Sequence, residues 1–307
     1  MHAFTLQEIQ CFDAVVREGG FQAAATLLNR SHAAIFAAIA KLEANLGVLL
    51  LDRSGYRVSL TEAGRSFHRK AQSLLGEMEG LQVHARQLAM GEETHLRVIL
   101  GDTCPLHEGL HLLGGFFAQC PQTRLDLHFE TIGGPSERLL EDEADLILHW
   151  VEKADPRLEW IDLGKISFVP VVAPGFLPFA LTRRISPDQM RGLTQCIIRD
   201  TARVAAKVSF YVLEGAPQCT VADHAMKKEV IIRGMAWGHL PRFMIEQELR
   251  DGRLVSIAGN AFPGIETELV AARRRDRPHG PVANRLWDYI RVHVPALWAD
   301  WSAFEKS

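Results

Sequence analysis

The sequence predicts an α/β protein that begins with a winged helix-turn-helix, and three observations lead to this fold class. The first 46 residues contain three apolar-periodic helical segments joined by short turns, and a hairpin pattern follows them. Residues 62–91 keep a heptad pattern, which is typical of a long helix that pairs with another helix. From Leu96 onward strand and helix patterns alternate, which predicts a parallel sheet covered by helices.

The bulk properties of the chain narrow its class without indicating a function. Its 307 residues, 47% hydrophobic and 23% charged, are typical of a globular protein with two or three domains. No run approaches the roughly 20 apolar residues of a membrane helix, and Met1–Thr5 does not begin a signal peptide, so we expect no membrane partner. Five scattered cysteines favour reduced thiols and a cytoplasmic location. The net charge of −3 does not indicate a nucleic-acid partner.

The first 46 residues predict three helices from local start and stop signals. Thr5 is the expected N-cap of a helix over Leu6–Glu18, which a pair of glycines ends. Phe21–Leu28 forms a second, short helix. Ser31 caps a third helix that runs to Leu46. Two helices joined by a turn of three or four residues are typical of a helix-turn-helix, whose second helix enters the major groove.

A β-hairpin, or wing, is expected directly after the third helix. Leu49–Arg53 and Tyr56–Leu60 are short apolar runs on either side of Ser54-Gly55. Arg53 and Arg57 lie in these runs, where their side chains can neutralise DNA phosphates or reach a minor groove.

Several residues in this region recur at fixed spacing. They are Phe12-x-Ala-Val-x-x-x-Gly19-x-Phe21-x-x-Ala24-Ala25-x-x-Leu28, Ser31, Ile39-x-x-Leu42-Glu43-x-x-Leu46-Gly47-x-x-Leu50-x-x-Arg53 and Leu60-Thr61-Glu62-Ala63-Gly64. With these residues the chain resembles the LysR-type transcriptional regulators. The match covers the first sixty-odd residues nearly without gaps.

The resemblance implies an organisation and a set of partners. The implied parts are a DNA-binding domain over residues 1–61, a linker helix over 62–91 and an effector-binding domain over 92–307, with lobe I about 94–166 and 269–307 and lobe II about 167–268. The two lobes would resemble periplasmic binding proteins. The implied partners are double-stranded DNA with an inverted-repeat operator, a small-molecule effector between the lobes, a second copy in a homodimer or homotetramer, and RNA polymerase for an activator.

The predicted recognition helix departs from the family pattern. The family usually has Ser-Gln-Pro-x-x-Ser-Arg-Gln there, but Phe36, Ala37 and Ala38 take the last three polar positions. Within the helix-turn-helix, Phe21 to Ala40, and the wing we expect DNA contacts from Ser31, His32, Ala33, Phe36, Ala37, Arg53 and Arg57. Two roles for Phe36 remain open: contact with thymine methyl groups, or packing against the second helix. Few base-edge hydrogen bonds are available, so the wing and DNA deformability should carry more of the specificity.

A long helix from Glu62 to about Gly91 is expected after the wing. Its heptad seam should pair two subunits through Phe67, Leu74, Met78, Leu81 and Leu88. Packing of the same residues onto the helix's own domain is the alternative.

The carboxyl ends of the predicted strands in the C-terminal part nominate an effector site. The candidates are Asp102, Thr103, Ile132, Gly133, His149, Trp150, Arg199, Asp200, Thr201, Trp237 and His239. Thr103 and Arg199 suit an anionic group, whereas the aspartates suit an amine or hydroxyl and the tryptophans offer ring faces. This mixture favours an amino acid-like or heteroaromatic effector. Alternatively, the aspartates cap helices and the tryptophans fill the core.

One motif suggests a different chemistry. His107-Glu108-Gly109-Leu110-His111 matches the HExxH pattern of zinc metalloproteases. Gly109 weakens the helix that the pattern needs, and no third-ligand motif follows. Cys104 and Cys196 lack a resolving partner in the sequence, which disfavours redox sensing. We therefore expect no catalytic residue, no metal and no cofactor, with a constitutive, redox-responsive or metal-responsive regulator and a zinc hydrolase as alternatives.

Overall fold

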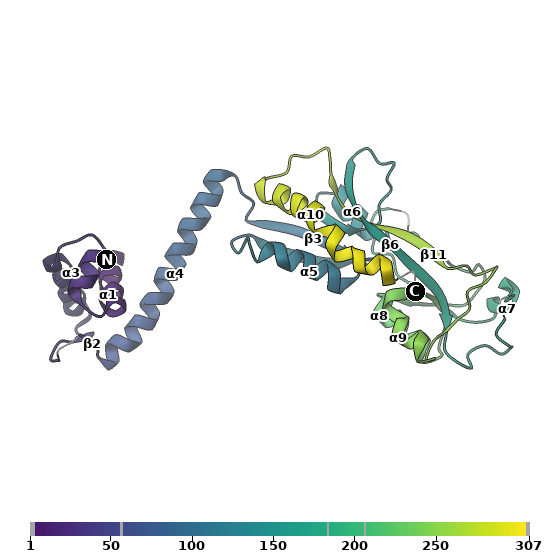
Figure 1. Cartoon of the computed structure of the whole chain (residues 1–307), viewed down its shortest axis with the longest axis horizontal. Coiled ribbons are helices and arrows are strands. Elements are labelled where there is room, and N and C mark those ends of the chain that lie inside the picture. The colour runs from purple at the N-terminus through teal and green to yellow at the C-terminus, as the bar shows by residue number, and fades with distance from the viewer. Residues whose placement is uncertain (1–3, 56–57, 183, 206, 305–307) are drawn as a thin grey trace. The chain divides into compact units, whose positions relative to one another are not determined.

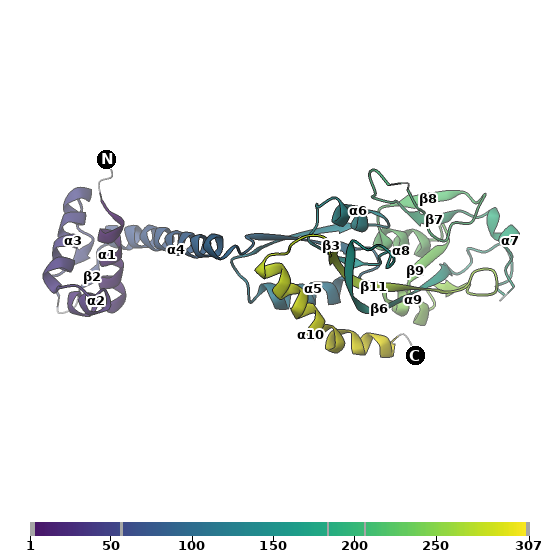
Figure 2. The same cartoon turned by 90° about the horizontal axis from the view of Figure 1, so that it is seen from above.

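The computed structural model describes residues 4–55, 58–182, 184–205 and 207–304, and all of their side chains except those of 84, 86–88 and 295–304. The chain divides into two compact units, Met1–Ala89 and Met90–Ser307. Figures 1 and 2 show both units, which are described here one at a time.

The N-terminal unit is a helical head, and its helices begin and end close to the residues that the local sequence signals predict. Its helices are α1 (Leu6–Glu18), α2 (Phe21–Leu27) and α3 (His32–Leu46). The Thr5 hydroxyl accepts from the backbone N–H of Glu8 and the Glu8 carboxylate accepts from Thr5, which forms a capping box. The Ser31 side chain caps α3 by accepting from Ala34. Buried side chains of all three helices and the wing form one core, among them Phe12, Val15, Ala24, Ile35, Ile39, Leu42 and Leu50.

The wing and the long helix complete this unit. The wing pairs β1 (Leu51–Asp52) with β2 (Ser59–Leu60), and α4 (Glu62–Met90) follows as a long helix (Figure 1). Close to its start, Phe67 packs its ring against Phe4 and Phe12 of the head. His68 lies 2.8 Å from Asp13 through its Nε2 and the Oδ1 atom. The first turns of α4 are thereby fixed to the head.

The C-terminal unit contains a seven-stranded mixed sheet with the order β10-β6-β11-β5-β3-β4, to which β9 adds on β6. The prediction that the strands run parallel is correct for β3 (His95–Gly101), β4 (Arg124–Glu130) and β5 (Leu146–His149). It is wrong for β6 (Leu158–Val172) and β11 (Ile265–Arg274), which run antiparallel to each other, β11 also running antiparallel to β5. Their ladder is continuous except for a β-bulge between Leu269 and Val270.

Two groups of elements share this pair of long strands, and we call them lobe I and lobe II. Lobe I contains β3, β4 and β5 with the helices α5 (Leu106–Phe117), α6 (Gly134–Leu140) and α10 (Pro281–Phe304). Within it α5 and α10 lie side by side (Figures 1 and 2). Lobe II contains β7 (Gln195–Ile198), β8 (Gln218–Val221), β9 (Gly238–Pro241), β10 (Val255–Ser256), α7 (Pro187–Arg191), α8 (His224–Ile232) and α9 (Arg242–Arg250).

Each lobe has its own apolar core. The core of lobe I includes Val98, Leu100, Leu112, Leu148 and Leu286. The core of lobe II includes Val171, Cys196, Ile231, Leu240 and Ile245, and the side chain of Ile132 joins it from the loop after β4. Because β6 contributes Ile166 to the core of lobe I and Val171 to the core of lobe II, it connects the two lobes mechanically.

Candidate functional site

A cavity of about 330 Å³ lies between the two lobes. Its volume is at the lower end of the range for small-molecule sites. It is lined by Asp102, Thr103, Ile132, Trp150, Val151, Phe168, Ile197, Ile198, Ser209, Phe210, Tyr211, His224, Lys227, His239, Glu266, Thr267 and Glu268. Five of these residues are among the candidates nominated from strand ends: Asp102, Thr103, Ile132, Trp150 and His239.

Four other candidates lie outside the cavity lining, and three of them, Gly133, Asp200 and Thr201, hold the chain around it. Asp200 is 5% exposed, and its carboxylate accepts from the backbone N–H groups of Gly133, Ala202 and Val208. Thr201 exchanges hydrogen bonds with the backbone of Thr131. These contacts hold the loop after β7 against the loop after β4. Gly133 lies in that contact, and the exposed Arg199 points outside the cavity lining.

Trp237 is also outside the lining because it fills the core of lobe II. It is 0% exposed and packs edge-on against Phe262, with ring centroids 5.2 Å apart. This is the packing role that the sequence left open for the tryptophans.

His149 lies directly behind the cavity and determines what Thr103 can offer. His149 is 0% exposed, and burial lowers its pKa although the Asp102 charge and the Ile132 carbonyl act in the opposite direction. The neutral ring must donate through Nε2 to the Ile132 carbonyl oxygen, 2.9 Å away. Its Nδ1 is then an acceptor, so the Thr103 hydroxyl donates to it across 2.9 Å. Thr103 therefore presents only its oxygen lone pairs to the cavity.

Replacing Gly101 by alanine is expected to disrupt this arrangement. A Cβ atom at position 101 would lie 2.1 Å from Nδ1 of His149, inside a packed core. We expect the free energy of unfolding of the C-terminal unit to fall by about 3 kcal/mol, measured by chemical denaturation. Gly114→Ala is the matched control, since no atom lies within 4 Å of its Cβ position. Equal stability of the two variants would contradict the proposed crowding at His149.

Lys227 and His224 are the main cavity residues that the strand-end reasoning missed. Both lie on α8, where His224, Lys227 and Ile231 form its buried face. Their spacing of three and four residues is the signal that would have placed Lys227 inside. Lys227 is 7% exposed, and burial lowers its pKa to about 8 although the Asp102 charge acts in the opposite direction.

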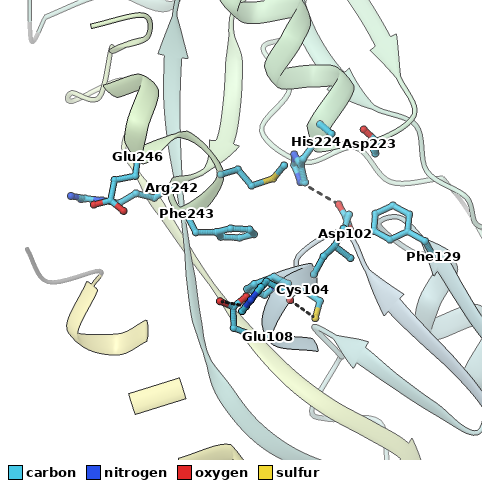
Figure 3. A pocket seen from close by; sticks show the side chains of 14 residues that line it. Asp102, Cys104, Glu108, Phe129, Asp223, His224, Arg242, Phe243 and Glu246 are labelled. Carbon is cyan, nitrogen blue, oxygen red and sulfur yellow. Dashed lines mark hydrogen bonds and ion pairs between the residues drawn. The ribbon is translucent and has the colours of Figure 1, made fainter. Parts of the chain in front are cut away.

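A second cavity, of about 710 Å³, also has Asp102 and His224 in its lining (Figure 3). These two residues line both cavities. Figure 3 shows their side chains pointing toward each other, with His224 Nε2 and Asp102 Oδ2 3.5 Å apart. The pair therefore forms part of the wall between the cavities.

The HEGLH segment lies at the start of α5. The His107 side chain is 90% exposed, and its ring stacks on that of His111 with centroids 6.5 Å apart. Among the described residues no group of three or more His, Cys, Asp or Glu side chains is arranged to hold a metal ion.

The cysteines differ from the sequence expectation in one respect. Cys196 lies opposite Cys219 in the parallel ladder of β7 and β8, so the expectation that it has no cysteine neighbour is wrong. Sequence spacing does not indicate this pair, because parallel strands bring together residues that are far apart in the chain. Burial raises the pKa of Cys196 to about 12, which keeps it a thiol at neutral pH.

On the head, the exposed face of α3 carries His32, Ala33, Phe36 and Ala37. Phe36 is 43% exposed and packs against Phe21, with ring centroids 5.5 Å apart. The Arg53 guanidinium lies 4.9 Å from the centroid of the same ring. Phe36 thus contacts the second helix and also faces solvent, so both of its roles stay open.

Arg53 connects the wing to α3 through a buried carboxylate. Its Nη2 lies 2.7 Å from Oε2 of Glu43, and Oε1 of Glu43 accepts from the backbone N–H groups of Leu50 and Leu51. The Arg53 guanidinium is therefore partly neutralised by its ion pair with Glu43 inside the head. Arg57, the other wing arginine nominated for DNA contact, lies outside the described residues.

The apolar residues of α4 that were expected to pair two subunits pack partly against the head of their own chain. Phe67 packs on the head core, as the alternative prediction for this helix allowed. Leu74 and Leu81 are 40% and 60% exposed, and Met78 is half-buried. The Leu88 side chain lies outside the described residues. In the part of α4 whose side chains are described, the distal seam thus exposes large apolar residues.

The sequence matches two family models. The LysR substrate binding domain matches residues 89–295, and the bacterial regulatory helix-turn-helix protein, lysR family, matches residues 6–65. No described helix is long and apolar enough to cross a membrane.

Curated relatives extend over most of the chain. The probable HTH-type transcriptional regulator YhaJ of Escherichia coli strain K12 is 29% identical over 284 residues, 89% of this chain and 92% of the relative. The HTH-type transcriptional regulator YeeY of the same strain is 30% identical over 253 residues, 81% of this chain and 82% of the relative.

Solved structures share the fold. A Corynebacterium glutamicum OxyR C206 mutant aligns with a TM-score of 0.52 at 18% identity, covering 97% of this chain and 94% of that one. Full-length LysG of Corynebacterium glutamicum aligns with a TM-score of 0.51 at 16% identity, covering 95% and 98% of the two chains.

Proposed function

The chain belongs to the LysR family of DNA-binding transcriptional regulators, and from this premise we propose that it controls promoters in response to a small molecule bound between lobes I and II. A regulator of this kind binds chromosomal DNA, so we assign it to the cytoplasm. A ligand can act only by binding one arrangement of the lobes better than another.

The observation that carries the proposal is the set of buried polar groups around the 330 Å³ cavity. Lys227 is 7% exposed and forms no hydrogen bond or salt bridge within the described part of the chain, so the Asp102 charge acts on it only through space. The Nδ1 atoms of His224 and His239 are buried without hydrogen-bond partners in the same part of the chain. Buried polar groups normally have hydrogen-bond partners. A ligand that supplies the missing partners would therefore bind with a favourable free energy.

We also infer a homodimer or homotetramer on an inverted-repeat operator. The exposed Leu74 and Leu81 support it, because seven residues separate them on one helix face and a partner helix would cover both. Two heads joined in this way would reach half-sites about 34–36 Å apart.

One experiment tests both parts of the proposal. Genomic DNA fragments that bind the full-length protein are selected and footprinted, and operator affinity is then measured with each member of a metabolite panel. We expect two protected half-sites and at least one metabolite that changes operator affinity about fivefold or more. The variant with Leu74→Lys and Leu81→Lys should lose the paired footprint, whereas Gln82→Lys on the exposed surface of α4 should keep it. A single protected half-site, or no effect of any metabolite, would contradict the corresponding part.

A further inference from the structure

Lys227 brings to the wall of the interlobe cavity a cation that has no direct hydrogen bond or salt bridge among the described residues, although the Asp102 charge acts on it from a distance. It projects from α8 beside β9, where Gly238 leaves room for its stem: a Cβ atom there would lie 2.9 Å from Cε of Lys227. The nearby Asp102 carboxylate forms no salt bridge with it and instead accepts from the backbone N–H of Ile132. A buried ammonium group without a partner is costly, and an anion placed beside it removes that cost.

Two neutral histidines flank this cation. Burial lowers the pKa of His239 to about 3, and burial also lowers the pKa of His224 although the adjacent Asp102 carboxylate opposes it. At neutral pH each ring therefore carries one donor and one acceptor nitrogen. Both histidines line the cavity, and their buried Nδ1 atoms lack hydrogen-bond partners among the described residues.

The lobe I side of the cavity offers acceptors instead. The Thr103 hydroxyl proton is already given to His149, so its oxygen can only accept from a ligand. The Asp102 carboxylate beside it is also an acceptor, and its pKa stays below the ordinary value: burial acts to raise it, but the contacts with His224, His149 and Ile132 outweigh that effect. A ligand that meets this wall needs an O–H or N–H donor.

Much of the remaining lining is aromatic. Trp150 and Phe210 meet edge-to-face with ring centroids 5.6 Å apart, and Tyr211 packs against Phe210 at 6.0 Å. Tyr211 also lies 5.1 Å from the ring of His239, and so continues the aromatic surface toward Lys227. Flat ring faces of this kind favour a planar ligand body.

We propose that the effector is a small planar carboxylate that also carries an O–H or N–H donor. Its carboxylate pairs with the Lys227 ammonium and accepts from the flanking histidines, and its donor binds Thr103 and Asp102. The inference rests on the proposed function and adds the chemical class of the molecule that the cavity takes.

The test measures binding to the full-length protein by calorimetry and by the shift in melting temperature. The probes are 4-hydroxybenzoate and indole-3-carboxylate, compared with the uncharged 4-hydroxybenzamide and with benzoate, which lacks the donor. We expect at least one of the two carboxylate probes to bind and both comparison compounds to bind at least about tenfold more weakly. A benzamide that binds as tightly as the carboxylates, or no carboxylate binding at millimolar concentration, overturns the proposal.

A lysine variant separates ligand recognition from folding. Lys227→Met keeps the length of the side chain and removes the buried charge, so the ligand-free protein should melt at the same or a higher temperature. Carboxylate affinity should fall at least about 30-fold. Lys228→Met is the control, because Lys228 pairs with Glu248 outside this cavity and its loss should leave carboxylate affinity within about twofold. Unchanged carboxylate affinity in Lys227→Met overturns the assignment.

The pH profile gives an independent readout. The charged and titratable groups that face Lys227 are Asp102, Cys196, His224 and His239, and their shifted pKa values keep each in one state between pH 7 and 9. Glu266 and Glu268, also in the lining, are paired with Lys165 and Lys153. Because the carboxylate binds the protonated lysine, affinity should be constant below pH 8 and fall about tenfold per unit above it. A flat profile in the native protein would count against the pairing.

Failure of this inference differs from failure of the proposed function. If an uncharged or cationic metabolite changes operator affinity while no carboxylate does, the effector role stands and the carboxylate class is wrong. If no molecule changes operator affinity, both are wrong.

Discussion

Replacing Glu43 by glutamine is expected to abolish operator binding and to lower the free energy of unfolding of the head by about 3 kcal/mol. Glu43 is 5% exposed and accepts from Leu50 and Leu51 through one oxygen and from Arg53 through the other. These bonds fix the first strand of the wing to α3. A neutral amide has a single acceptor oxygen, so it can accept from the two backbone N–H groups or from Arg53, but not from both sides as the carboxylate does.

The loss of DNA binding should exceed the loss of stability because Arg53 also lies over Phe36 on the exposed face of α3. An Arg53 side chain without its carboxylate partner would hold neither the wing against α3 nor its own position over the Phe36 ring. Denaturant unfolding and operator affinity are measured for Glu43→Gln and for the exposed Glu18→Gln as control. Native operator affinity in Glu43→Gln would show that the wing does not depend on this carboxylate.

Acidification from pH 4.5 toward pH 2 should remove about 3 kcal/mol of stability that depends on Glu137. Burial opposes the ionisation of this carboxyl group, but the backbone N–H groups of Ala205, Arg203 and Val204 and the Arg138 guanidinium together hold its pKa at about 2. The ordinary value is 4.5, so the unfolded chain takes up a proton first as the pH falls. The contribution is complete above pH 4.5 and is lost as the pH passes through 2.

Glu137→Gln tests this contribution. The variant should be less stable than the native protein by about 3 kcal/mol at pH 7, and the difference should shrink between pH 4.5 and pH 2. Glu141→Gln is the control, since Glu141 is 40% exposed and lies 3.7 Å from the same Arg138 guanidinium. A stability difference that does not change with pH would mean that the Glu137 charge has no role in holding residues 203–205.

The head was predicted almost residue by residue because its signals are local. Thr5 and Ser31 fix two helix starts through hydrogen bonds that reach only three residues along the chain. Gly47, with φ 69°, ends α3 in a left-handed conformation that glycine adopts at low cost. Such signals do not depend on the rest of the fold.

The cavity was predicted only in part because its residues come from two kinds of element. Asp102 and Trp150 follow parallel strands of lobe I, where the strand-end rule applies. Arg199 and Asp200 also follow a strand, but the Asp200 carboxylate is used to hold its own loop. Lys227 lies on a helix face, which a search of strand ends does not examine.

The antiparallel ribbon of β6 and β11 was the largest omission in the fold. The sequence indicates strands at Phe168–Val172 and Glu266–Ala272, whereas β6 already begins at Leu158 and β11 runs from Ile265 to Arg274. Its pairing with β11 joins residues about a hundred positions apart, so no local pattern indicates it.

This ribbon also sets how a ligand signal can travel. A single-stranded hinge would let the lobes swing about one or two bonds, but ten paired positions resist bending in the plane of the ladder and yield more easily to torsion. The bulge at Leu269 and Val270 interrupts that resistance at one point and adds local twist. Closure around a ligand should therefore be a small rotation of one lobe against the other about the strand axis. A rotation grows into a larger displacement with distance from its axis, so the elements farthest from the ribbon would move most.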